Sequence, residues 1–491
     1  MPGPEPNETR VRSLAVAAAA SLLVLVAIPF DLVPLLRGPA PYPPEWQWAF
    51  RPGGPARPLW GAAACALGLL GLLWASGTGR ARGRPAPARR ALIAGAVLLG
   101  CGLQVGLLAR EPGSPLRTLL SRARSRSFTS YHTVAISPEA RDPATFLRGH
   151  ATHLSEWTRS AKHAATHPPG PILYYRAALG LCEASPAMTD GLLRAAGVPD
   201  REFRPPATRA ARAAALLGAL LLVLLGALTA WPVGALARAL GAGDLPATRL
   251  AILWALVPGP ALMTPQFDQA LALPVALATL LLLTTASGTW RAVAAGALGG
   301  AALLTSYGAA AFLVIGGLAA IATNATDRGA LRRAVTAALL ATGVAGLVAF
   351  GLPALLGHEP LRALLSALSI HREVFTAPRS YALWLLFNPV DLALFLGVPV
   401  AVAGLWASVA SRREPLSCAL ARYRWAVFGG LLALLLAGVT RGEVGRLWIP
   451  LMPLLLVAIL REEDGLDRRD SLVYGVLLAA FTLAMGSYWV V

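Results

Sequence analysis

Acidic residues and lysine are scarce in this chain of 491 residues. Charged residues make up 14% of it, 25 are Asp or Glu, and arginine supplies all of the 43 basic residues except Lys162. Hydrophobic residues make up 56%. A soluble domain of this length needs more charged surface, so the composition indicates a polytopic membrane protein.

Cysteine is also sparse, and several sequence motifs are missing. The four cysteines are scattered and form neither a disulfide framework nor a CxxC metal pattern. Walker A, GxGxxG, HExxH and serine-elbow motifs are absent, so nucleotide-dependent chemistry is unsupported. The net charge of +18 does not indicate a nucleic-acid partner, because much of the arginine lies in short segments between apolar runs.

Long apolar runs are abundant. Each span needs roughly 20 apolar residues to cross about 30 Å of hydrocarbon. We expect an all-α, polytopic bundle of thirteen spans, at 13–36, 59–76, 91–109, 208–234, 249–264, 270–286, 292–305, 309–323, 334–356, 389–410, 425–440, 447–460 and 472–489. The first run lacks a small-residue cleavage site and reads as a retained signal anchor.

Arginine is unevenly distributed between the short loops, which predicts an orientation. Arginine-rich segments at 79–90, 326–333, 411–424 and 461–469 would be cytoplasmic, whereas the turns at 264–269 and 305–308 carry no basic residue. The N-terminus is then cytoplasmic and the C-terminus outside. The Arg-, Ala-, Gly- and Leu-rich composition suggests a bacterial plasma membrane.

Three regions follow from this topology: three spans in 1–109, an outer loop with juxtamembrane helices at 110–207, and a bundle at 208–491 with a second outer loop at 357–388. The first outer loop holds five of the seven histidines and Lys162, and the other two histidines lie in the second loop. The apolar stretch 171–185 is short for a span and is expected to stay outside. Titratable groups gathered on one face favour chemistry there.

Three short motifs carry a resemblance. Thr166-His167-Pro168-Pro169-Gly170 enters a helix, the segment 258–269 forms an outer acidic turn that ends in Asp268-Gln269, and Arg441-Gly442-Glu443-Val444-Gly445-Arg446 precedes a late span. In order and sidedness, over about 110–460, they resemble the GT-C superfamily of membrane glycosyltransferases. The family 39 type, which includes protein mannosyltransferases, aminoarabinose transferases and rhizobial galacturonosyltransferases, is the nearest resemblance.

That resemblance implies an inverting transfer of a sugar from a polyprenyl-phosphate carrier to a lipid, glycan or protein acceptor of the cell envelope. A carboxylate takes the acceptor proton, and cations stabilise the departing phosphate. No cofactor is expected beyond the lipid-linked donor, and a divalent metal is not supported. Membrane lipids are the other expected partners.

The resemblance does not settle the base. Asp142 is a candidate, although an Asp before Pro also caps helices; Glu139 and Glu111 are weaker candidates. Asp268 opens a predicted helix, where it either complements the helix dipole or faces the catalytic cavity.

The substrate-binding candidates have equally ordinary alternatives. Arg441, Glu443 and Arg446 would grip a lipid phosphate or form an interfacial Glu–Arg pair. His167 belongs to a rigid Pro-rich turn. Lys162 and His163 precede it and are also expected near the substrate, although a solvated lysine is commonplace. The histidine spacings approach those of metal ligands, but Cys and tightly spaced acidic residues are lacking, so a zinc site is not expected.

Two other functions compete with glycosyl transfer. A transporter or lipid flippase would place charged residues and broken helices near the membrane midplane. A non-catalytic partner in cell-envelope assembly is the remaining alternative.

Overall fold

A computed structural model describes residues 6–77, 86–198, 208–285, 288–410, 418–460 and 466–490. Residues 78–85, 411–417 and 461–465, which belong in part to the arginine-bearing segments on which the predicted orientation depends, lie outside the described residues. Helices dominate the rest, because a backbone in an apolar surrounding must satisfy its polar groups internally.

In chain order, the helices of the bundle form two sets that pack against each other. The first set comprises α1 (Pro6–Phe30), α2 (Trp60–Ala75), α3 (Ala86–Leu107), α10 (Arg209–Leu228), α11 (Ala230–Ala239), α12 (Asp244–Trp254), α13 (Pro258–Leu262) and α14 (Phe267–Leu283). The second set comprises α15 (Trp290–Thr305), α16 (Ala309–Asn324), α17 (Arg328–Gly346), α18 (Leu352–Leu355), α20 (Tyr381–Leu396), α21 (Val398–Ala410), α22 (Ala419–Ala437), α23 (Val444–Leu447), α24 (Met452–Val457) and α25 (Arg468–Tyr488).

Shorter helices build the predicted outer loops. They are α4 (Pro115–Arg124), α5 (Tyr131–Ala135), α6 (Pro143–Ser160), α7 (Lys162–Ala165), α8 (Gly170–Ala184), α9 (Pro186–Ala195) and α19 (Pro360–His371). Single turns of 3₁₀ helix occur at η1 (Pro34–Arg37), η3 (Leu108–Arg110), η4 (Pro138–Ala140) and η9 (Ile449–Leu451), and π-helical turns occur at η7 (Leu347–Gly351) and η8 (Arg372–Thr376).

Among the described residues, seven helices are long and apolar enough to cross a membrane, or up to eight if one bent pair counts as a span. The thirteen predicted spans are therefore not confirmed, although an all-α bundle is. Three predicted spans coincide with shorter apolar helices, α2, α14 and α16. The stretch 447–460 is broken into short, buried helical pieces.

The predicted span at 389–410 has a sharp bend. Helix α20 begins earlier, at Tyr381, and the axis turns by 114° between Leu396 and Val398. Gly397 occupies the break with φ +93°, a conformation that costs glycine little. Helix α8 covers most of the short apolar stretch 171–185. It is not among the described helices that are long and apolar enough to cross a membrane.

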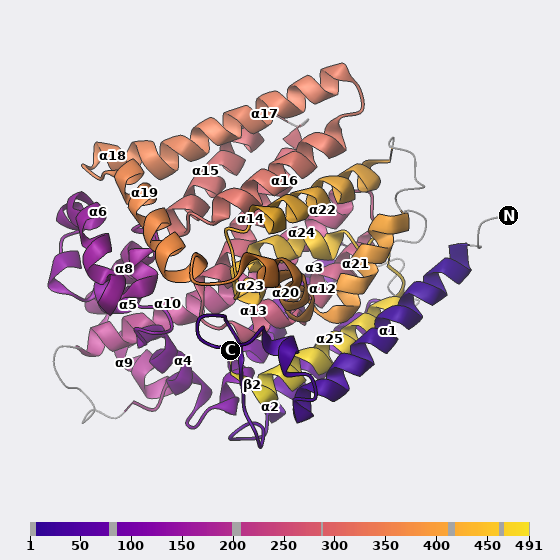
Figure 1. The fold of residues 1–491 in the computed structure, drawn as a ribbon, viewed down its shortest axis with the longest axis horizontal. Helices are drawn as coiled ribbons and strands as arrows, with labels where there is room; N and C mark the ends of the chain where they lie inside the picture. The colour runs from indigo at the N-terminus through magenta and orange to yellow at the C-terminus, as the bar shows by residue number, and fades with distance from the viewer. Residues whose placement is uncertain are drawn as a thin grey trace.

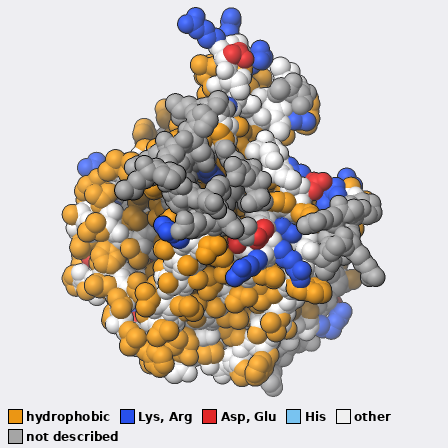
Figure 2. Space-filling view, turned by 90° about the vertical axis from the view of Figure 1, so that its right-hand side faces the viewer, with side chains coloured by type: hydrophobic (Ala, Val, Ile, Leu, Met, Phe, Trp, Pro, Cys, Tyr) orange, Lys and Arg blue, Asp and Glu red, His pale blue; other side chains and the backbone are white. Residues whose placement is uncertain are grey.

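The two ends of the bundle differ (Figure 1). The region 110–198 packs around α10 and α19 at one end, which we call the loop end, where α18 also lies. Helix α17 runs along one edge of the molecule and starts at the end away from the loop end. Figure 2 shows the opposite end, with blue basic side chains standing out on a largely orange surface.

Residues 31–59 connect α1 to α2 and pair with the C-terminal strand of the chain. Strand β1 (Ala49–Phe50) pairs antiparallel with β2 (Trp489–Val490). In the same segment the buried Glu45 accepts hydrogen bonds from Trp384 Nε1 at 2.7 Å and from the Ser380 backbone N–H at 2.9 Å. This carboxylate thus fixes the start of α20 against the first connection.

We expect Glu45→Ala to lower the free energy of unfolding by about 2–4 kcal/mol, because it leaves the buried Trp384 N–H without an acceptor. The control is Glu359→Ala, which removes an exposed pair with Arg362 and should change stability by less than about 0.5 kcal/mol. Denaturant titration of both variants in detergent measures the difference. Equal free energies of unfolding for Glu45→Ala and Glu359→Ala would contradict the structural role of Glu45.

Candidate functional site

The segment 441–446, at the loop end, carries an unusual backbone. Gly442 has φ +94° and Glu443 has φ +58°, so two consecutive residues adopt the left-handed conformation. For a non-glycine residue this conformation costs free energy and persists where the surroundings impose it. Here it turns the Glu443 side chain back over α23, which starts at the next residue.

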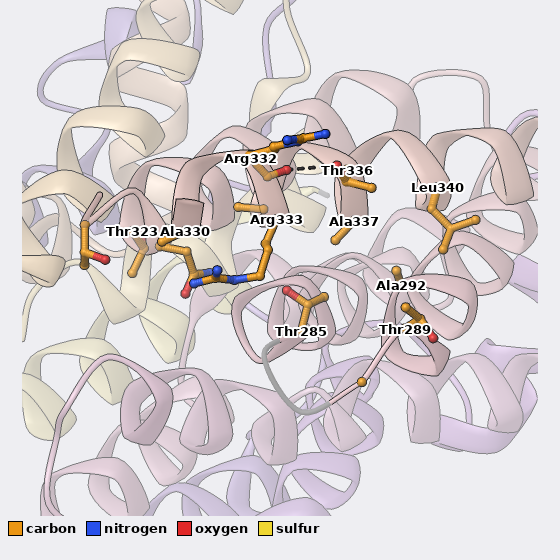
Figure 3. A pocket seen from close by; sticks show the side chains of 14 residues that line it. Thr285, Thr289, Ala292, Thr323, Ala330, Arg332, Arg333, Thr336, Ala337 and Leu340 are labelled. Atoms are coloured by element: carbon orange, nitrogen blue, oxygen red, sulfur yellow. Dashed lines mark hydrogen bonds between the residues drawn. The ribbon is translucent and has the colours of Figure 1, made fainter. Parts of the chain in front are cut away.

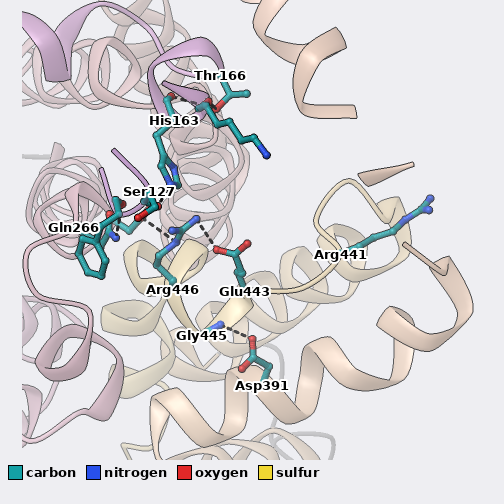
Figure 4. A network of polar contacts seen from close by, with 12 residues as sticks. Ser127, His163, Thr166, Gln266, Asp391, Arg441, Glu443, Gly445 and Arg446 are labelled. Carbon is teal, nitrogen blue, oxygen red and sulfur yellow. Dashed lines mark hydrogen bonds and ion pairs between the residues drawn. The ribbon is translucent and has the colours of Figure 1, made fainter. Parts of the chain in front are cut away.

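Helix α20 fixes this turn through two polar side chains. Asn388 donates to the Thr440 carbonyl at 2.8 Å, and its oxygen accepts from the Gly442 N–H at 3.3 Å. Asp391 accepts from the Gly445 N–H at 2.9 Å and from Trp48 Nε1 at 2.8 Å (Figure 4). A Cβ at Gly445 would lie 2.1 Å from the Phe395 ring, so glycine permits this close approach.

Arg446 is the centre of an ionic cluster. Its Nη2 lies 2.8 Å from Glu443 Oε2, and its Nε lies 3.8 Å from Asp268 Oδ2, at the start of α14. Burial lowers the pKa of Arg446, but the Glu443 and Asp268 carboxylates raise it by a larger amount, so the net shift is upward. The buried Nε has no hydrogen-bond partner among the described residues. Arg446 is thus a fixed cation with one donor left over.

A second arginine reaches the cluster from the segment 357–388. Arg379 lies 3.6 Å from Glu443 and donates to the Arg441 carbonyl. The Arg441 side chain instead binds the backbone carbonyls of Thr376, Arg379 and Gly438 and points away from Glu443 (Figure 4). The predicted pairing of two arginines around one acid is present, but Arg379 takes the place of Arg441.

Histidines border a small cavity of about 50 Å³ beside the cluster. It is lined by His163, His167 and His371 together with Arg379, Glu443 and Arg446. Burial and then the charge of Arg446 lower the pKa of His163 to about 4, and burial and His163 lower the pKa of His167 to about 3. Both rings are therefore neutral near pH 7. They offer hydrogen bonds to a ligand without adding charge.

A larger cavity of about 390 Å³ adjoins the same ion pair. Glu443 and Arg446 line it, as do the indoles of Trp46 and Trp48 and the Glu111–Arg122 salt bridge. Arg122 also donates to the Thr264 carbonyl at 2.9 Å. The Glu443–Arg446 pair thus belongs to the walls of both cavities. Cations, carboxylates and aromatic faces together suit a ligand with phosphate and sugar-like parts.

The structure divides the candidate bases into two groups. Asp268 contacts Arg446 but lines neither cavity, and Glu111 lines the larger one. Asp142 is exposed and accepts from the Thr145 N–H at 2.8 Å as the cap of α6, the ordinary alternative for this residue. Hydrogen bonds from Thr145 lower the pKa of Asp142. A hydrogen bond from Ser137 is the main cause that lowers the pKa of the exposed Glu139. Neither residue lines the cavities described above.

The substrate-binding candidates also separate. His163, His167, Arg441, Glu443 and Arg446 all line the small cavity, whereas Lys162 is exposed and does not. No group of three or more His, Cys, Asp or Glu residues in the described ranges is arranged to hold a metal ion.

Sequence reasoning missed the residues that position the turn. Asn388 and Asp391 are three residues apart within an apolar helix, and Glu45 lies in a connection with no recognised motif. Polar residues inside an otherwise apolar span are expensive and often functional, and that signal could have drawn attention to the first two. Nothing in the sequence paired Trp48 with Asp391 across 343 positions.

The fold and the site together define a class: an all-α protein with several helices able to cross a membrane and a buried ionic cluster at one end. Comparison with family models, with curated proteins and with solved structures finds no match to this chain.

Acidification should destabilise the site. Unfolded histidine titrates near pH 6.5, whereas His163 and His167 do so at about 4 and about 3, so the folded protein binds fewer protons between these values. Stability is then complete above pH 6.5 and is lost as the pH falls toward 4, by up to about 1.4 kcal/mol per pH unit for each histidine. Melting temperatures from pH 7 to 5 should fall less steeply in His163→Gln/His167→Gln. His153→Gln, on α6, should keep the native slope; equal slopes in all three proteins would refute the assignment.

Asp391→Asn should disturb the turn, because an amide can accept from only one of the Trp48 and Gly445 N–H groups in this geometry. We expect a loss of about 1–3 kcal/mol in unfolding free energy. A fluorescence change from Trp48 should accompany it. Asp327→Asn, which alters an exposed helix cap at the opposite end, is the control for the charge change. An unchanged stability of Asp391→Asn would argue against its role.

Proposed function

We propose that the chain is a membrane glycosyltransferase that moves a sugar from a polyprenyl-phosphate carrier to an acceptor of the bacterial cell envelope, at the extracytoplasmic face of the plasma membrane. The observation that supports this most is the Glu443–Arg446 pair in the walls of two cavities at the loop end. Arginines and carboxylates side by side meet the demands of a departing phosphate and an attacking hydroxyl.

Arg446, Arg379 and Arg122 are suited to the phosphate. Guanidinium groups bind phosphate oxygens in pairs and stay charged when buried. The unused Nε donor of Arg446 is one point of attachment. As the bond between the sugar C1 and the phosphate oxygen breaks, these cations stabilise the negative charge that develops on the leaving group.

Among the acids, Asp268 is the best candidate for the base. Glu443 is bound by two arginines and Glu111 is bound by Arg122, so both carboxylates are engaged in holding cations. Asp268 has a single ion-pair contact within the described part of the chain, at 3.8 Å and beyond hydrogen-bonding reach. It would accept the acceptor's hydroxyl proton as the oxygen attacks C1 from the face opposite the phosphate, which inverts the configuration.

A lipid transporter or flippase is the second candidate. The 114° bend at Gly397 and the broken helix over 444–457 resemble the discontinuous helices of transporters. The ionic cluster argues for chemistry because it lies at one end of the bundle, beside the outer-loop helices, and not midway along long spans.

The test is release of labelled polyprenyl phosphate from a panel of polyprenyl-phosphate sugars, with purified protein in liposomes and a membrane extract as acceptor. Loss of a general base typically costs 10²- to 10⁴-fold, so we expect Asp268→Asn to lose about that much activity. Asp142→Asn, at the exposed cap, should remain within about twofold of the native protein.

Other outcomes would revise the assignment. Equal activity of Asp268→Asn and the native protein would move the base to Glu111 or Glu443. Release abolished by Asp142→Asn alone would contradict the site. No release from any donor, together with lipid movement between leaflets in the same liposomes, would replace the enzyme with the transporter.

A further inference from the structure

A separate cavity lies at the opposite end of the bundle, where α14 and α16 end and α15 and α17 begin. Its volume is about 760 Å³, within the range of about 300–1,000 Å³ that is usual for small-molecule sites. The residues described along its wall include five threonines, Asn324, Arg332 and Arg333, and no carboxylate. It shares no residue with the two cavities at the loop end.

The polar rim of this cavity carries donors and positive charge. In Figure 3, Arg333 reaches from α17 toward Thr285, whereas Arg332 lies along the other side of that helix. Within the described ranges neither guanidinium has a hydrogen bond or ion pair, but the charge of Arg333 interacts with the nearby Asp327 carboxylate, which caps α17 by accepting from the Ala330 N–H. The Thr289 hydroxyl is likewise not engaged. Two helices begin and two end here, so their dipoles largely offset each other and the arginines set the sign.

Part of the cavity wall is apolar, further along α17 and at the start of α15. Ala292, Ala334, Ala337 and Leu340 form it. Only 11% of the apolar window of α17 is buried, so this helix lies on the outside of the bundle with side chains such as Leu339 exposed. The cavity therefore continues from a basic rim onto a surface suited to hydrocarbon.

The adjacent start of α15 has the character of a membrane–water interface. Trp290 is 61% exposed, and the Arg291 guanidinium lies over its ring at 5.5 Å. Tryptophan favours the depth of lipid headgroups, and arginine there extends toward the aqueous side. This independent feature sets the cavity at headgroup level.

We propose that this cavity binds an anionic glycerophospholipid, with the headgroup phosphate at Arg333 and an acyl chain along Ala337 and Leu340. The two exposed arginines and the absence of acid from the described lining favour an anion. The apolar part of the wall and its continuity with the exposed face of α17 favour a lipid. The inference depends on the helices spanning a membrane but not on glycosyl transfer.

The experiment is native mass spectrometry of the full chain in detergent, titrated with phosphatidylglycerol, with phosphatidylcholine or with inorganic phosphate. A basic residue near an anionic lipid contributes about fivefold in affinity. Arg333→Gln should therefore weaken phosphatidylglycerol binding about fivefold, and Ala337→Phe, which fills the apolar wall, should weaken it at least as much. Arg469→Gln, an exposed arginine at the start of α25 that does not line the cavity, should leave it unchanged.

Each other outcome would overturn the proposal. Equal phosphatidylglycerol affinity in Arg333→Gln and the native protein would remove the headgroup assignment, and Arg333 is exposed, so that variant is expected to fold. Equal affinity for phosphatidylcholine would show that charge plays no part. Binding of inorganic phosphate that requires Arg333 and excludes phosphatidylglycerol would identify a site for a free anion.

Discussion

Burial of the Arg446 guanidinium in an apolar bundle is the constraint on which the loop end depends. A buried charge is tolerated only beside opposite charge and hydrogen-bonding groups. Glu443 supplies the nearest carboxylate, Asp268 the second, and Arg379 balances Glu443 from another loop. Segments far apart in sequence must therefore meet at one point, and the left-handed turn at Gly442 and Glu443 makes that meeting possible.

The supports of this cluster lie one layer further out. Asn388 and Asp391 hold the turn through its backbone, and Trp48 joins Asp391 to the first connection of the chain. Charged groups at this depth keep a fixed geometry only if their neighbours cannot rearrange, because each lost hydrogen bond would leave a buried polar atom unsatisfied. Such preorganisation is what a site acting on a charged lipid requires.

The two ends of the bundle are built differently. At the loop end, short helices and connections cover the ionic cluster and enclose small cavities around it. At the opposite end, the first turns of α17 border an open cavity lined by both basic and apolar side chains. The proposed functions follow this difference: chemistry on a lipid-linked substrate at the enclosed end, and retention of a surrounding lipid at the open end.

The sequence by itself determined the class of the protein. Scarce charge and long apolar runs require helices, and the sequence also predicts that the histidine-rich loops, Asp268 and the segment 441–446 lie at one end. Only the tertiary structure decided which of these residues meet. It brought Arg379 to Glu443, turned Arg441 away, and left Asp142 as a helix cap, because side-chain direction and the packing of loops against α20 depend on contacts that no local pattern encodes. The number of spans was similarly beyond the sequence, since a break such as that at Gly397 depends on how neighbouring helices pack.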